Sequence, residues 1–394
     1  QTCAELGFHG GTTACAGGCQ HDTSGCERCS SDVHVFACRA PAPAQAVAEN
    51  FGLAANTDRI ALAWVTVEPS GAGFENAGGT VQLQLLDASL AVVSRAPCLA
   101  APGARSVSLV AVPGGWIAAY ARGTPGGYTA VYAQRYDAMA QPAGGPAFVV
   151  EGSNPRLTAG DGTIVLLEYE IWSGGGNASA GAVILHSDGT AATLAQTVFE
   201  GIYSLDHEGA VWAGDAFMLA AREFRPPTDA EAVVRLERDG TISARTQPVG
   251  QATEYGQLAW DGSHVTLVYG SFGGAAVMRA QPLDMMGRNA GATIDLIAQG
   301  LIYIVAYPVW IGGGFAMLQS DRGGPWTLQA APFDSSFHSL AAAWPVGRGG
   351  TFGLGDRVRT GVLGVAGTSE RLVVGWTEMT PTGDRALALG VVAQ

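Results

Sequence analysis

The sequence of 394 residues contains no lysine, so its 21 basic residues are all arginines, against 34 Asp and Glu residues. Charged residues make up only 14 % of the chain and the net charge is −13. This balance argues against a nucleic-acid partner, because phosphate backbones are bound by clustered Lys and Arg. No apolar run approaches the ~18 residues of a membrane-spanning helix, so we expect no membrane span. The chain also lacks a phosphate-binding glycine loop, so we expect no cofactor. It lacks the Gly-x-Ser-x-Gly motif that carries the nucleophile of many serine hydrolases.

Cysteine is scarce in most of the chain but dense at its start. Cys98 stands alone, and the other six of the seven cysteines are Cys3, Cys15, Cys19, Cys26, Cys29 and Cys38. A segment this short and polar buries too little apolar surface to fold without crosslinks. We therefore predict that residues 1–40 form a small disulfide-bonded module, which is typical of an oxidising compartment.

The Cys26-x-x-Cys29 motif allows a second interpretation, a tetrahedral zinc site completed by neighbouring cysteines or histidines. We favour disulfides and predict no metal, because the motif is not repeated and the compartment is expected to be oxidising. The residue after Cys29 is Ser30 rather than His, which excludes covalent haem attachment. The sequence does not choose among the possible disulfide pairings, and Cys98 is either a buried free thiol or a partner of the module.

The cysteine-rich segment resembles a short module of predicted secreted proteins and lipoproteins of myxobacteria and related bacteria. The shared pattern covers residues 2–29 and consists of Cys3, Leu6-Gly7-Phe8, Gly10-Gly11, Cys15, Cys19, Asp22-Thr23-Ser24 and Cys26. The resemblance implies export and surface presentation, not a reaction. The chain begins at Gln1 rather than Met, which we interpret as a product whose targeting segment was removed or as a trimmed chain. We expect a secreted protein that is extracellular, at the cell surface or periplasmic.

Residues 41–394 repeat one strand pattern. The clearest unit is Leu258–Tyr269, in which an apolar strand runs into a tight Asp261-Gly262 turn and a second apolar strand follows. Equivalent second strands recur about every 50 residues, at Ile60–Val67, Trp116–Ala121, Thr163–Glu170, Phe217–Arg222, Val265–Tyr269, Phe315–Gln319 and Arg371–Trp376. A third and a fourth strand follow in most units. This pattern predicts an all-β fold, a seven-bladed β-propeller with four-stranded blades.

The seventh unit reaches Gln394 after its third strand. We therefore predict that an N-terminal strand near Ala44–Glu49 completes the last blade, because closing the ring removes exposed sheet edges. Pro41 and Pro43 mark a linker, so the predicted domains are the cysteine-rich module, 1–40, and the propeller, 41–394.

The loops between second and third strands are predicted to share one face of the ring, and loops on a rigid scaffold commonly hold binding residues. Trp172 stands out because Ser173 and three glycines follow it. An exposed Trp suits stacking on a sugar or anchoring a partner, and the alternative is a ring folded over a neighbouring blade. The candidate ligand-binding residues on this face are Trp172, Asn177, Glu170, Arg225, Phe272, Trp326 and Arg322.

Glu168 and Glu170 share one face of a strand, and with Arg222 and Glu223 they suggest an acid–base cluster. We interpret them instead as a solvated or salt-bridged strand end, and predict no catalytic residue. The remaining polar groups carry no metal spacing: His186, His207, His264 and His338 are scattered, and the Asp-Gly pairs at Asp161, Asp188, Asp239 and Asp261 are interpreted as turns, not calcium loops.

The sequence therefore predicts a secreted, non-catalytic binding protein whose ligand is a glycan or a surface protein. A first alternative is a structural subunit of a surface layer or appendage that self-assembles through the cysteine-rich module. A second alternative is a propeller lyase or hydrolase, which requires Glu168, Glu170 or Glu223 to converge within ~5–10 Å around a pocket.

Overall fold

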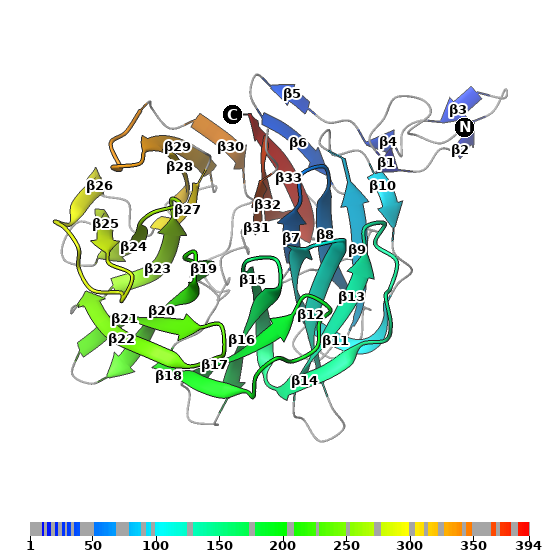
Figure 1. Cartoon of the computed structure of the whole chain (residues 1–394). Coiled ribbons are helices and arrows are strands. Elements are labelled where there is room, and N and C mark those ends of the chain that lie inside the picture. The colour runs from blue at the N-terminus through cyan, green and yellow to red at the C-terminus, as the bar shows by residue number, and fades with distance from the viewer. Residues whose placement is uncertain are drawn as a thin grey trace.

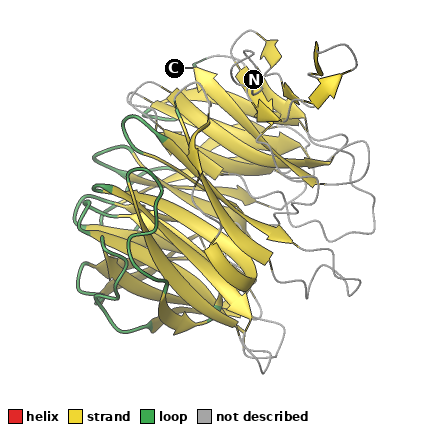
Figure 2. Ribbon diagram, turned by 90° about the vertical axis from the view of Figure 1, so that its right-hand side faces the viewer, coloured by secondary structure: helices red, strands yellow, loops and turns green. Residues whose placement is uncertain are grey.

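The computed structural model describes most of the chain between residues 51 and 340 and shorter stretches on either side. The described residues are 10–11, 14–16, 20–22, 26–27, 30–32, 35–39, 51–67, 79–87, 92–95, 99–123, 129–172, 178–202, 209–225, 228–249, 253–271, 277–298, 304–310, 314–321, 327–340, 344–348, 364–367, 371–379 and 385–393. All regular structure in them is β-strand, with no helix (Figure 2). The all-β prediction is confirmed. No helix within these ranges is long and apolar enough to cross a membrane.

Two large antiparallel sheets hold the first half of the fold. The first has the order β14-β13-β12-β11-β9-β8-β7, with β10 also paired to β9. Its strands are β7 (Phe51–Ala55), β8 (Ile60–Val67), β9 (Gly79–Leu86), β10 (Val92–Arg95), β11 (Leu99–Val112), β12 (Gly115–Gly123), β13 (Thr129–Asp137) and β14 (Ala147–Glu151).

The second large sheet has the order β15-β16-β17-β18-β20-β21-β22, with β19 paired to β20. Its strands are β15 (Ser153–Ala159), β16 (Ile164–Trp172), β17 (Ala178–His186), β18 (Gln196–Ile202), β19 (Ala210–Trp212), β20 (Ala216–Arg225), β21 (Thr228–Glu237) and β22 (Ile242–Val249). A single residue pair, Ile202 with Glu223, joins β18 to β20.

Two four-stranded sheets follow, each in sequence order. The strands are β23 (Thr253–Trp260), β24 (Val265–Ser271), β25 (Val277–Leu283) and β26 (Ile294–Ala298), then β27 (Ile304–Trp310), β28 (Gly314–Asp321), β29 (Thr327–Asp334) and β30 (Trp344–Arg348). In Figure 1 the strands β15, β19, β23 and β27 lie nearer the middle of the view, and β14, β18, β22 and β26 lie at its outer edge.

The C-terminal strands pair with the N-terminal region of the chain. The order of this sheet is β31-β32-β33-β6-β5, with β31 (Gly364–Gly367), β32 (Arg371–Met379), β33 (Arg385–Ala393), β6 (Val35–Arg39) and β5 (Ser30–Asp32). An N-terminal strand thus lies beside the last strand, but it is β6, whereas the predicted segment 44–49 lies outside the described residues. Two small pairs precede it: β1 (Gly10–Gly11) with β4 (Cys26–Glu27), and β2 (Ala14–Ala16) with β3 (Gln20–Asp22).

Tight turns connect several of these strands on one face of the molecule (Figure 2). Gly162, Gly189, Gly240 and Gly262 have φ of +92°, +90°, +84° and +97°, a backbone region that favours glycine. The Asp before each of these glycines accepts a hydrogen bond from the backbone N–H two residues further on. The prediction that the Asp-Gly pairs are turns is confirmed.

The core consists of apolar layers between neighbouring sheets. Each strand of a sheet covered on both sides contributes alternate residues to two layers. Val165, Leu167 and Tyr169 of β16 pack against Ile117 and Ala119 of β12. The intervening residues of β16 face the opposite way, and their layer holds the candidate site.

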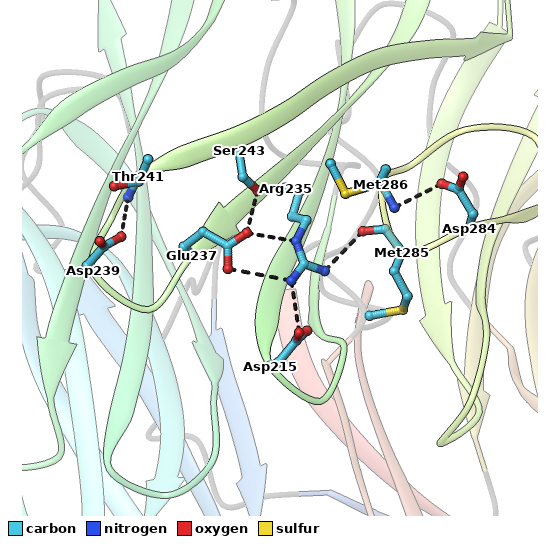
Figure 3. Close-up of polar contacts among 9 residues, drawn as sticks. All are labelled: Asp215, Arg235, Glu237, Asp239, Thr241, Ser243, Asp284, Met285 and Met286. Carbon is cyan, nitrogen blue, oxygen red and sulfur yellow. Dashed lines mark hydrogen bonds and ion pairs between the residues drawn. The ribbon is translucent and has the colours of Figure 1, made fainter.

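A polar network around Arg235 lies at the end of these layers where the tight turns are. The Arg235 guanidinium of β21 lies 2.8 Å from Glu237, 3.0 Å from Asp215 and 3.0 Å from the carbonyl oxygen of Met285 (Figure 3). Arg235 is 8 % exposed. Since Met285 follows β25, this arginine ties the β19–β22 strands to the neighbouring β23–β26 sheet.

Candidate active site

Strand β16 presents a row of acidic residues to the layer it shares with β20. Ile164 and Leu166 of β16 belong to one core cluster with Phe217, Leu219 and Ala221 of β20. Side chains two apart on a strand share a face. Glu168, Glu170 and Trp172 therefore lie on the same face of β16 as Ile164 and Leu166. Glu223 lies on the same face of β20 as Phe217, Leu219 and Ala221. We call this the β16/β20 layer. Three carboxylates from two strands therefore face one layer.

Glu168 is buried in this layer, with 2 % of its surface exposed. Burial penalises the charged carboxylate and raises the pKa of Glu168 from 4.5 to about 7, although Arg156 opposes the shift. Arg156 of β15 lies opposite Glu168 in the strand register. Near neutral pH, Glu168 therefore exists in both its proton-donating and its proton-accepting form, as an acid–base catalyst requires.

Glu170 is fully buried and is held by two donors from different strands. The Asn154 Nδ2 atom lies 2.6 Å from its Oε2, and the Trp172 Nε1 atom lies 3.0 Å from the same oxygen. Both contacts come from N–H donors, so this oxygen is the acceptor in each. Asn154 has a φ of +46°, a left-handed backbone that costs free energy in a residue other than glycine. The geometry therefore fixes the orientation of the Glu170 carboxylate.

Glu223 closes the layer from the β20 side. It is fully buried and forms an ion pair with Arg245 of β22. Arg245 also donates to the carbonyl oxygen of Val198 at 2.6 Å and lies 5.4 Å from the ring of Phe199. The backbone N–H of Glu200 is 3.4 Å from the same Glu223 oxygen. The positive charge of Arg245 is therefore committed to a buried carboxylate of the layer.

The opposite face of β16 is locked by close packing around Tyr169. A Cβ placed on Gly181 meets the Tyr169 ring at 2.2 Å, and one placed on Gly152 meets it at 2.5 Å. Only glycine accommodates approaches this close. Because Tyr169 lies between Glu168 and Glu170, this packing limits the movement of both carboxylates.

One buried acid escaped the sequence analysis. Glu231 of β21 is fully buried and faces the next layer, where its Oε1 atom lies 1.9 Å from the position of a Cβ built on Gly256. It lies opposite Arg222 in the β20–β21 register, a pairing that no sequence motif marks. Asn154 and Arg245 were also missed.

The structure brings together two of the predicted ligand-binding residues, Glu170 and Trp172. Trp172 is 49 % exposed, and its role in ligand binding stays a prediction. Arg225 ends β20. The predictions for Asn177, Phe272, Arg322 and Trp326 lie outside the described residues.

Arg156 lies opposite Glu168 in the register, which fits the salt-bridged form of the strand-end interpretation. The solvated form is wrong for Glu168 and Glu170. They are 2 % and 0 % exposed because β16 is the second strand of its sheet and is covered on both faces. Exposed charges at a strand end have little effect on stability, whereas buried ones face a large desolvation penalty.

Two of the described histidines lie at exposed turns. His264 and His338 are exposed and lie 3.4 Å and 3.2 Å from the Asp of their own turns. Among the residues that the structure describes, no three His, Cys, Asp or Glu side chains are grouped as a metal site. Cys15, Cys26 and Cys38 lie on β2, β4 and β6, and the disulfide prediction falls otherwise outside the described part of the chain.

No protein-family model matches the chain, and no curated protein sequence does. A protein of unknown function from Dyadobacter fermentans is similar in structure, with 11 % identity and a TM-score of 0.47, covering 88 % of this chain and 96 % of that one. The Trypanosoma rangeli sialidase has 11 % identity, a TM-score of 0.41 and coverages of 78 % and 57 %. The GH43_1 enzyme from Xanthomonas citri, complexed with xylose, has 12 % identity, a TM-score of 0.39 and coverages of 64 % and 92 %. Values this low transfer no residue role and no substrate.

The prediction of a non-catalytic binding protein is corrected by these findings. The similar structures include a sialidase and family-43 glycoside hydrolases, which are enzymes. Glu168, Glu170 and Glu223, the residues of the enzyme alternative, face one buried layer.

Proposed function

We propose that this chain is a glycoside hydrolase in which Glu168 is the general acid and Glu170 the partner carboxylate. The observation that carries the proposal is the contrast between these two same-face neighbours. Burial keeps a proton on Glu168 up to about pH 7, whereas two N–H groups bind one oxygen of Glu170. Glycoside hydrolysis uses such a pair, one carboxyl group donating a proton and the other acting as a carboxylate.

The spacing of the pair suits this reaction. Residues two apart on a strand have Cα atoms about 6.6 Å apart, at about 3.3 Å per residue. Carboxyl separations of about 5–5.5 Å serve retaining hydrolases and about 6.5–9.5 Å serve inverting ones. The anomeric form of the first product distinguishes these two geometries.

In the proposed reaction, the carboxyl group of Glu168 donates its proton to the glycosidic oxygen as the bond from that oxygen to the anomeric carbon breaks. The Glu170 carboxylate either attacks the anomeric carbon or removes a proton from the attacking water. In the first case a glycosyl ester forms on Glu170, and water then cleaves it while the deprotonated Glu168 takes up the proton of that water. Either route adds one water molecule across the bond. Since both residues are almost fully buried, the proposal requires the sugar to reach them from the exposed Trp172 end of β16.

The experiment is a hydrolysis screen with 4-nitrophenyl pyranosides and neutral oligosaccharides. We expect Glu168→Gln and Glu170→Gln each to lower kcat/KM by a factor of about 100 or more with a natural leaving group. Glu151→Gln, on an exposed position of β14, is the matched control and should retain full activity. The proposal fails if the wild-type protein cleaves nothing, or if the two layer variants match the control.

The proposed scaffold is a β-propeller of seven four-stranded blades. Strand order supports this division into β7–β10, β11–β14, β15–β18, β19–β22, β23–β26, β27–β30, and β31–β33 with β6. Each large sheet then comprises two blades, joined by the β9–β11 and β18–β20 pairs. In this arrangement the β16/β20 layer lies between two adjacent blades.

We further propose that the protein acts outside the cytoplasm with a disulfide-bonded N-terminal segment. Six cysteines within 38 residues support this. Intact-mass measurement after alkylation, with and without reduction, should show six protected thiols before reduction. Six thiols that alkylate freely in the unreduced secreted protein would contradict it.

A further inference from the structure

Trp172 differs from the other described tryptophans in its exposure. It is 49 % exposed at the end of β16, whereas Trp64 is 8 % and Trp116 0 % exposed. It occupies the same strand face as Glu168 and Glu170, at the end that opens to solvent. An aromatic ring next to a buried carboxylate pair is well placed to contact whatever reaches that pair.

The orientation of the Trp172 ring is fixed. Its Nε1–H group donates to Glu170 Oε2 at 3.0 Å, and Glu170 is fully buried. Turning the ring away would break a hydrogen bond to a fully buried acceptor, which costs more than breaking one that water can replace. The small side chain of Ala178 lies opposite Trp172 in the β16–β17 register. The ring therefore presents a preset apolar surface beside the carboxylates.

This surface suits a pyranose ring. The face of an aromatic ring carries negative charge density, which attracts the weakly positive C–H groups on one face of a sugar. The side chain beside the Trp172 ring is the acidic Glu170, and its named donors, Asn154 and Trp172, are neutral. The cations of the layer lie elsewhere, Arg156 opposite Glu168 and Arg245 on Glu223. An anionic sugar therefore fits the Trp172 end of the layer poorly. The chemistry therefore favours a neutral oligosaccharide.

We propose that Trp172 is a binding platform for a neutral pyranose and that its N–H group simultaneously positions Glu170, so that one residue links substrate binding to catalysis. This inference rests on the proposed hydrolase function. The ring face determines affinity, and the N–H group determines how the carboxylate is aimed. These two roles can be separated by substitution.

The test compares Trp172→Phe with Trp172→Ala on the glycoside cleaved best by the wild-type protein. Phe keeps an aromatic face but lacks the N–H donor, so kcat should fall about tenfold while KM stays within about twofold. Ala removes both, so KM should also rise about tenfold. Phe148→Ala removes another exposed aromatic, 58 % exposed on β14, and should leave both constants unchanged. Thermal unfolding of each variant confirms that it is folded.

Binding by the Glu168→Gln variant separates this inference from the proposed function. We expect calorimetry to show that the Glu168→Gln variant binds xylotriose or cellotriose but not sialyllactose. The double variant, which also carries Trp172→Ala, should bind neither neutral sugar. Loss of binding in this double variant, without hydrolysis by the wild-type protein, would support the platform and overturn the hydrolase proposal. Hydrolysis with equal KM in the wild type and both Trp172 variants would overturn the platform and leave the hydrolase. Preferential binding of sialyllactose would also overturn the inference.

Discussion

The Asn154 Nδ2 atom donates to Glu170 Oε2 at 2.6 Å from a backbone with a φ of +46°. The two residues lie on adjacent strands, and the pairing of β15 with β16 is irregular between Ser153 and Arg156. This irregularity and the left-handed backbone place the amide against the carboxylate. Strain of this kind is retained where the surrounding structure enforces it, commonly at functional sites.

Two substitutions of Asn154 distinguish its backbone strain from its role in positioning Glu170. Asn154→Gly removes the amide but accepts the positive φ, whereas Asn154→Ala removes the amide and keeps the strain. We expect the Ala variant to be less stable than the Gly variant by about 1 kcal/mol in chemical denaturation. Both should lower kcat by about 10- to 100-fold because Glu170 loses the Asn154 donor that orients it. Equal stability of the two variants would contradict the strained backbone.

Glu168 should make stability depend on pH in an unusual direction for an acid. Its pKa rises from 4.5 to about 7 on folding, so the folded state binds the proton more tightly than the unfolded state. The resulting stabilisation is complete below pH 4.5 and is lost as the pH rises through about 7. Denaturation curves of Glu168→Gln should lack this dependence, and relative to the wild type the variant should gain about 3 kcal/mol between pH 4 and pH 8. A constant difference across this range would show that the Glu168 pKa is not raised.

Gly181→Ala should disturb the support of the carboxylate pair. Its new methyl group would lie 2.2 Å from the Tyr169 ring, and the ring is confined on its other side by Gly152. Overpacking of this kind costs about 1–3 kcal/mol. Gly145→Ala is the control, because nothing lies within 4 Å of a Cβ at that position. Equal melting temperatures for the two variants would show that Tyr169 is free to move.

Lysine should not replace Arg235 without a loss of stability. Its guanidinium reaches Glu237, Asp215 and the Met285 carbonyl oxygen together, which a single ammonium group does not match (Figure 3). We expect Arg235→Lys and Arg235→Ala both to lower the free energy of unfolding, the second by about 2 kcal/mol, since hydrogen bonds to charged groups contribute about 1.5–3 kcal/mol. A lysine variant as stable as the wild type would show that charge alone suffices.

The strands and turns of this fold could be predicted well from the sequence. Alternating apolar strands and Asp-Gly turns identified the hairpins, because the turn residues and the two-residue period act locally. The same period placed Glu168 and Glu170 on one face. It did not predict their burial, which depends on the sheets that cover β16 from both sides.

The rest of the site depends on contacts between distant segments. Asn154 reaches Glu170 only through an irregular strand pairing and a left-handed residue, and Arg245 reaches Glu223 from two strands away. No sequence spacing reports such contacts. The functional prediction failed for the same reason, since it treated the carboxylates as solvated side chains.

The most direct test of the central claim is the leaving-group dependence of Glu168→Gln. A general acid is needed when the leaving alcohol is poor and is dispensable when it is good. Relative to the wild type, the variant should therefore lose at least about 100-fold in kcat/KM on an alkyl or sugar glycoside. It should lose less than about tenfold on the matching 2,4-dinitrophenyl glycoside. An equal loss on both substrates, or no loss on either, would contradict the assignment of Glu168 as the general acid.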